Sequence, residues 1–165
     1  MGQLRLRPKH VVAHPANVFA LGFGLGLSKY APGTVGSLLG LPLFLLLQPL
    51  GIFGMLIAIA VLFGFGVWCC EVCSKNLEVH DHPGIVWDEV VGMLITLLFA
   101  PLSWLSLLLG FLLFRFFDVL KPWPIGWVDA RVSGGLGIML DDVLAGIFAL
   151  AALQIILHWL VPLVS

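Results

Sequence analysis

The sequence predicts an all-α membrane protein, a polytopic bundle of four to five spanning helices with a short N-terminal helix. Its composition is too apolar for a soluble domain: 61% of the 165 residues are hydrophobic and 10% are charged, against about a quarter charged in an average soluble domain. Lys, Arg, Asp and Glu are absent from residues 30–70, 90–114 and 143–165. Since about 20 mostly apolar residues cross a bilayer as a helix, we expect the spanning helices there.

Prolines and glycines divide these uncharged stretches into separate helices. Gln48-Pro49-Leu50-Gly51 breaks the first stretch, and Ala100-Pro101 breaks the second because the residue before a proline avoids the helical region. A short helix, tilted or re-entrant, is expected at Ala16–Leu27, where Gly22 and Gly26 favour close helix contact. The expected spanning helices are Gly36–Gln48, Ile52–Ser74, Ile85–Phe99, Ser103–Leu120 and Asp142–Val161.

The order of these helices predicts which segments share a membrane face. Two helix hairpins return the chain to one side, where the segments Lys29–Ser37, Glu78–Glu89, Arg115–Pro124 and Gly134–Asp142 then meet. Lys and Arg residues gather on this side and in residues 1–15, so the positive-inside rule places this face in the cytoplasm. Residues 1–15 are expected to form a cytoplasmic leader and residues 16–165 a single membrane domain.

The net charge and the cysteines argue against a nucleic-acid-binding protein and against a zinc site. A net charge of −1 gives no indication of a nucleic-acid partner. Cys69, Cys70 and Cys73, with His80 and His82 nearby, offer a conceivable zinc site. The spacing lacks a second pair of ligands, so free thiols packed in a helix are the favoured interpretation.

The segment Lys29–Ser37 combines a cation with small residues ahead of a helix. Gly33 and Gly36 would let the backbone approach a ligand, and the helix N-terminus offers free N–H groups to an anion. The alternative is that Thr34 or Ser37 simply caps the helix.

Two further segments place charge at helix ends. Asp88 and Glu89 lie one turn inside an apolar helix, where buried carboxylates are candidates for function. Arg115, Asp118 and Lys121 recur every three residues and therefore share a helix face. These five groups form either an interfacial ion network or a metal ligand set flanked by phosphate-binding cations.

A Gly-rich segment, Gly134–Gly137, is expected to lead as a loop into a helix whose first turn carries Asp141 and Asp142. Acidic first turns also occur simply because they complement the helix dipole. In combination, five carboxylates from three helix ends suit Mg²⁺, which also binds phosphate oxygens. With cations at lipid headgroup depth, the pattern favours metal-assisted phosphoryl transfer.

Four strings carry a family resemblance: APGTVGSL, HDHPGIVWDEVVG, FRFFDVLKPWPI and GGLGIMLDDVLAG. In order and spacing they resemble the bacterial phosphatidylglycerophosphatase A family, over about residues 21–146. The resemblance implies a Mg²⁺-dependent, multi-pass enzyme of the bacterial inner membrane with its site facing the cytoplasm. It also implies hydrolysis of the lipid phosphatidylglycerophosphate to phosphatidylglycerol and inorganic phosphate.

The hypothesis that follows assigns a role to each candidate residue. Mg²⁺ would be held by Asp88, Glu89, Asp118 and Asp142. Asp81, His82 or Asp141 would act as the base for an attacking water, with a covalent aspartyl intermediate as the alternative. The expected substrate-binding residues are Lys29, Thr34, Ser37, Arg115 and Lys121.

Three other kinds of protein remain as alternatives. One is a lipid phosphatase or phosphotransferase that acts on a related headgroup. Another is a membrane transporter lined by carboxylates, in which the acidic groups should lie near mid-span on several helices. The third alternative is a non-catalytic membrane scaffold. Such a protein would have no need of five carboxylates beside a Gly-rich segment.

Overall fold

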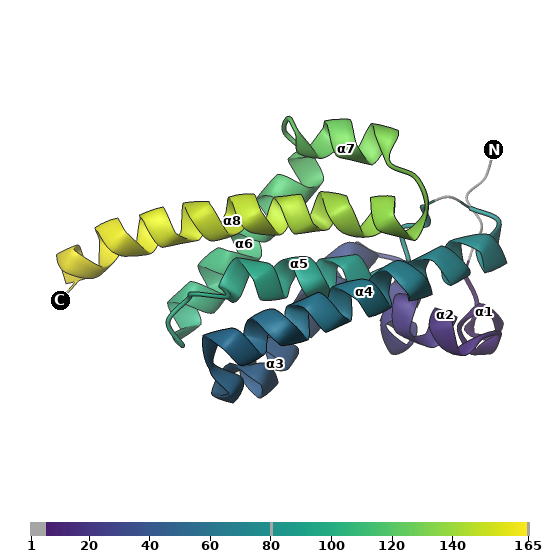
Figure 1. Cartoon of the computed structure of the whole chain (residues 1–165), viewed down its shortest axis with the longest axis horizontal. Coiled ribbons are helices and arrows are strands. Elements are labelled where there is room, and N and C mark those ends of the chain that lie inside the picture. Colours follow the sequence, from purple (N-terminus) through teal and green to yellow (C-terminus); the bar gives the residue numbers. More distant parts are fainter. Residues whose placement is uncertain (1–5, 80, 165) are drawn as a thin grey trace.

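The computed structural model describes residues 6–79 and 81–164, and in these residues it contains helices and no strand (Figure 1). Arg5 of the leader and His80 of the zinc alternative lie outside the described residues. The α-helices are α1 (Pro8–Val12), α2 (Pro15–Ala20), α3 (Pro32–Leu47), α4 (Gly51–Leu77), α5 (Trp87–Leu97), α6 (Trp104–Leu120), α7 (Ile125–Arg131) and α8 (Gly134–Val164). Two 3₁₀ helices, η1 (Gly22–Leu27) and η2 (Gln48–Leu50), connect them.

Helix α5 is the core of the bundle. Every residue of α5 except Ile95 is buried, Asp88 and Glu89 included. The helix packs against α3, α4, α6 and α8, and Figure 1 shows it between α8 and α4. At 1.5 Å per residue, α5 is about 17 Å long, well short of the roughly 30 Å hydrocarbon core of a bilayer.

Glycines bring the backbones of α5 and α8 into direct contact. A Cβ atom added at Gly146 would lie 2.6 Å from the carbonyl oxygen of Gly92. One added at Gly92 would lie 2.7 Å from Phe114 Cζ and 2.9 Å from the carbonyl oxygen of Asp142. Since real side chains do not tolerate such distances, this contact requires glycine, and it holds the acidic starts of the two helices together.

Two helical stretches are long and apolar enough to cross a membrane: Pro32–Leu77, which contains α3 and α4, and Gly134–Trp159 in α8. Large apolar side chains also point outward from α4, among them Phe53, Ile57 and Val61. An apolar surface of this extent marks contact with a partner or a membrane. The long helices and this surface together indicate membrane association.

Most expected helices are present with small shifts at their ends, but two expectations need correction and two helices were not expected. The helix expected at Ala16–Leu27 is divided into α2 and η1, because Gly22, Phe23 and Gly24 have positive φ angles. The expected loop at Gly134–Gly137 is wrong, since these residues form the first turn of α8. Helices α1, inside the expected leader, and α7 were not predicted.

Candidate active site

A cavity of about 620 Å³ lies where the start of α3, the approach to α5, the end of α6 and the start of α8 meet. We call it the carboxylate pocket, because acidic side chains dominate its wall. It is lined by Ala31, Pro32, Gly33, Asp81, Pro83, Ile85, Asp88, Glu89, Arg115, Asp118, Val119, Lys121, Asp141 and Asp142. The structure therefore brings all five carboxylates expected from three helix ends into one cavity.

Three of these carboxylates form a tight cluster. One oxygen each from Asp88, Glu89 and Asp142 lies within 4.8 Å of the others, although the three residues are at most 9% exposed. One oxygen of each, and one of Asp141, is buried without a hydrogen-bond partner among the described residues. Buried charges are normally paired or bound to metal, so this donor set fits a hard divalent cation such as Mg²⁺.

Arg115 faces the cluster from α6. Its Nη1 atom forms an ion pair with Asp118, one turn further along the helix, and lies 3.9 Å from Glu89 Oε1. The same nitrogen donates to Ser37 Oγ at 3.4 Å. Gly33 makes room for this arrangement, because a Cβ atom there would lie 3.1 Å from Arg115 Nη1. The Arg115 side chain thus contacts both the acidic cluster and the first turns of α3.

Lys121, directly after α6, also lines the pocket. Its Nζ atom donates to Asp141 Oδ2 at 2.7 Å and to Asp129 Oδ1 at 2.8 Å. Burial lowers the pKa of Lys121, but these two bonds outweigh that effect and hold the pKa above its ordinary value. The ammonium group therefore stays charged at neutral pH and supplies positive charge to the pocket.

The remaining predicted residues lie around the pocket or away from it. Ser37 is buried, and its hydroxyl donates to the carbonyl oxygen of Gly33 at 2.8 Å while accepting from Arg115. Asp81 lines the pocket and is exposed, whereas Thr34 does not line it. Lys29 and His82 line a neighbouring cavity instead.

The Gly-rich segment has a different role from the expected phosphate loop. The N–H of Gly135 donates to Glu71 Oε2 of α4 at 2.6 Å, so a protein carboxylate already binds the start of α8. A Cβ atom at Gly135 would also lie 2.6 Å from the backbone nitrogen of Glu71. The glycines let α8 approach α4, and Asp141 and Asp142 follow about two turns inside the helix.

Sequence reasoning missed Glu71 and Asp129, which bind the start of α8 and Lys121. Asp129 could have been identified by its charge, since it lies in the short segment after Lys121. No pattern marked Glu71, since its partner is a backbone group 64 residues away.

Comparison with known proteins agrees with this geometry. The family model described as Phosphatidylglycerophosphatase A matches residues 18–157. The phosphatidylglycerophosphatase A of Escherichia coli (strain K12) is 40% identical over 158 residues, which cover 93% of this chain and 91% of that protein. The same-named protein of Haemophilus influenzae is 47% identical over 149 residues, covering 89% and 91%. No solved structure matches.

The fold and the pocket define an all-helical, membrane-associated enzyme that hydrolyses phosphoric monoesters. Acidic groups that could hold a metal ion lie in one cavity with two cations, and this combination suits such a reaction. The family match covers most of the chain, and both relatives are at least 40% identical to it over most of their own length. The chain belongs to the phosphatidylglycerophosphatase A family.

Arg115 should bind phosphate rather than only neutralise its acidic neighbours. A planar guanidinium fits two phosphate oxygens, whereas an ammonium group offers a point charge. We therefore expect Arg115→Ala to lower turnover about 10²- to 10³-fold, and Arg115→Lys to lower it measurably despite the retained charge. The measurements are phosphate release and melting temperature on the same detergent-purified protein.

The matched control for Arg115 is Arg131→Ala, which removes a guanidinium that lies outside the pocket, 4.6 Å from the ring centre of Trp127. This variant should keep its turnover. If Arg115→Ala kept normal turnover and lost only melting temperature, Arg115 would be a structural partner of Asp118 and Glu89.

Proposed function

We propose that this protein removes the terminal phosphate of phosphatidylglycerophosphate, producing phosphatidylglycerol and inorganic phosphate for phospholipid biosynthesis. One observation carries the proposal: buried acidic oxygens without hydrogen-bond partners among the described residues line a single cavity together with Arg115 and Lys121. Family membership supports the choice of lipid, since both relatives carry the name of this activity.

We further propose that Mg²⁺ is the metal, held by Asp88, Glu89 and Asp142 with Asp118 as a fourth ligand. The first three already have oxygens within one metal-sized cluster, and Asp118 lines the same pocket. Bound there, Mg²⁺ supplies Lewis-acid stabilisation of the charge on the phosphoryl group.

The other residues of the pocket bind the phosphate and accept a proton. Arg115 and Lys121, which both line the cavity, offer N–H groups to phosphate oxygens. The start of α3, with Gly33 in the wall, adds the positive end of a 16-residue helix. Of the three candidate bases, Asp81 and Asp141 line this pocket, which favours them over His82 as acceptors of the proton from water.

The position of the acidic groups argues against a transporter. Asp88 and Glu89 lie in the first turn of α5, and Asp118 is two residues before the end of α6. A relay of protons or cations needs charged groups at membrane depth along a pathway. Here they gather at one end of the bundle, as a lipid headgroup site requires.

Removing one ligand from the cluster should stop the reaction without unfolding the protein. In Asp88→Asn or Asp142→Asn the metal ion would be held poorly and the remaining carboxylates would repel one another. We therefore expect turnover to fall at least about 10²-fold. Chelation by EDTA should stop phosphate release by the unaltered protein, and added Mg²⁺ should restore it. The assay is phosphate release from phosphatidylglycerophosphate in detergent.

The control for these variants is Glu78→Gln, which changes an exposed carboxylate outside the pocket and should leave turnover unchanged. Near-normal activity of Asp88→Asn or Asp142→Asn would remove that residue from the site. Activity that resists EDTA would exclude the metal from the mechanism.

We also propose a multi-pass arrangement in the bacterial inner membrane, with the carboxylate pocket facing the cytoplasm. Helices α3 and α4 form one hairpin and α5 and α6 another, so α8 starts at the end of the bundle that holds the pocket. Figure 1 shows α8 running from there to the opposite end of the molecule, away from α1. This path favours a cytoplasmic N-terminus and a periplasmic C-terminus.

Reporter fusions test this topology. An alkaline phosphatase fused after Ser165 should be active, because that enzyme matures in the periplasm. The same reporter fused after Glu78, at the pocket end of α4, should be inactive, whereas green fluorescent protein there should fluoresce. Reporters that place both positions on one side of the membrane would contradict this arrangement.

A further inference from the structure

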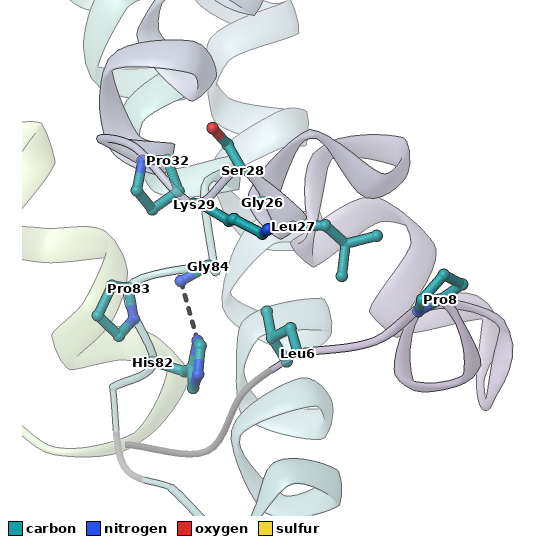
Figure 2. Close-up of a pocket in the computed structure, with 10 residues that line it drawn as sticks. All are labelled: Leu6, Pro8, Gly26, Leu27, Ser28, Lys29, Pro32, His82, Pro83 and Gly84. Atoms are coloured by element: carbon teal, nitrogen blue, oxygen red, sulfur yellow. Dashed lines mark hydrogen bonds between the residues drawn. The ribbon is translucent and has the colours of Figure 1, made fainter. Parts of the chain in front are cut away.

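A second cavity, also of about 620 Å³, opens beside the carboxylate pocket. We call it the Lys29 pocket, because Lys29 is the one Lys or Arg among the described residues that line it. Figure 2 shows Lys29 and Leu27 on one side of the opening and Leu6 and His82 on the other. The described residues that line it are Leu6, Pro8, Gly26, Leu27, Ser28, Lys29, Pro32, His82, Pro83 and Gly84, and none of these carries a carboxylate.

The two cavities are neighbours that share part of their walls. Pro32, at the start of α3, and Pro83, in the approach to α5, line both. The wall of the Lys29 pocket is closed by backbone packing, because a Cβ atom at Gly84 would lie 2.7 Å from the carbonyl oxygen of Gly26. The N–H of Gly84 donates to His82 Nδ1 at 3.0 Å, which holds that ring in place. Pro32 and Pro83 therefore mark the boundary that a single ligand would cross to occupy both cavities.

Lys29 is available to an external anion. Within residues 6–79 and 81–164 its ammonium group has no hydrogen bond or ion pair, whereas Lys121 and Lys75 each bind a carboxylate. Lys29 is also exposed, and it lines the cavity next to Ser28. One free cation among apolar side chains suits a singly charged group that continues into an apolar one.

Resting on the function proposed above, we propose that the Lys29 pocket binds the phosphodiester and adjoining glycerol of the same lipid whose terminal phosphate lies in the carboxylate pocket. The charges match. A phosphomonoester carries about −1.5 to −2 at neutral pH and needs the metal and two cations of the first pocket. The phosphodiester carries a single negative charge, which one ammonium group balances without a metal. Leu6 and Leu27 then lie beside the apolar end of the lipid.

The proposal predicts selective effects of removing Lys29. For Lys29→Ala the KM for short-chain phosphatidylglycerophosphate should rise about tenfold, the loss of one charge-assisted hydrogen bond, with kcat little changed. Phosphatidylglycerol has the phosphodiester but no terminal phosphate, so its constant for competitive inhibition should rise by a similar factor. Inorganic phosphate, which has no phosphodiester, should inhibit as before. Lys29→Arg should keep most of the affinity for both lipids.

Lys75→Ala is the matched control, because Lys75 is an exposed cation outside both pockets. It should change none of these constants. Equal weakening of all three ligands by Lys29→Ala would show a general attraction for anions and overturn the proposal. Unchanged constants, or no inhibition of the unaltered protein by phosphatidylglycerol, would also overturn it. Failure of the unaltered protein to release phosphate would instead refute the function proposed above.

Discussion

The constraint on which the structure depends is the burial of several like charges at one end of an apolar bundle. Asp88, Glu89, Asp141 and Asp142 are each at most 9% exposed, and a buried charge without a partner is costly. Arg115 and Lys121 offset part of this charge. The acidic groups outnumber the cations in the pocket, which leaves buried acidic oxygens for the bound cation proposed above.

The packing of the bundle serves this cluster. Gly92 and Gly146 let α8 lie against α5, which sets Asp142 beside Asp88 and Glu89. Glu71 secures the start of α8 through the N–H of Gly135. Glycines that bring helices together are common in membrane proteins, where packing rather than exclusion of water drives association. The stability of the bundle and the geometry of the site therefore rest on the same contacts.

Much of this arrangement was accessible from the sequence, because charge and proline mark helix ends in an apolar chain. α6 begins one residue later than expected and ends at the expected residue, Leu120. The Gly-rich segment was misread, since glycine serves both phosphate loops and close helix contacts, and only the packing of Gly135 on α4 distinguishes them. The separation of Lys29 from the carboxylate pocket was likewise invisible, because it depends on how η1 packs against residues 82–84.

Direct binding of a metal tests the central claim, that the buried carboxylates form a divalent-cation site. Mn²⁺ accepts the same oxygen ligands as Mg²⁺ and is detected by electron paramagnetic resonance in detergent-purified protein without any turnover. We expect saturable Mn²⁺ binding that Mg²⁺ displaces, that persists in Glu78→Gln and that is lost in the double variant Asp88→Asn, Glu89→Gln. Equal Mn²⁺ binding by the double variant and the unaltered protein, or no binding by either, would contradict the account.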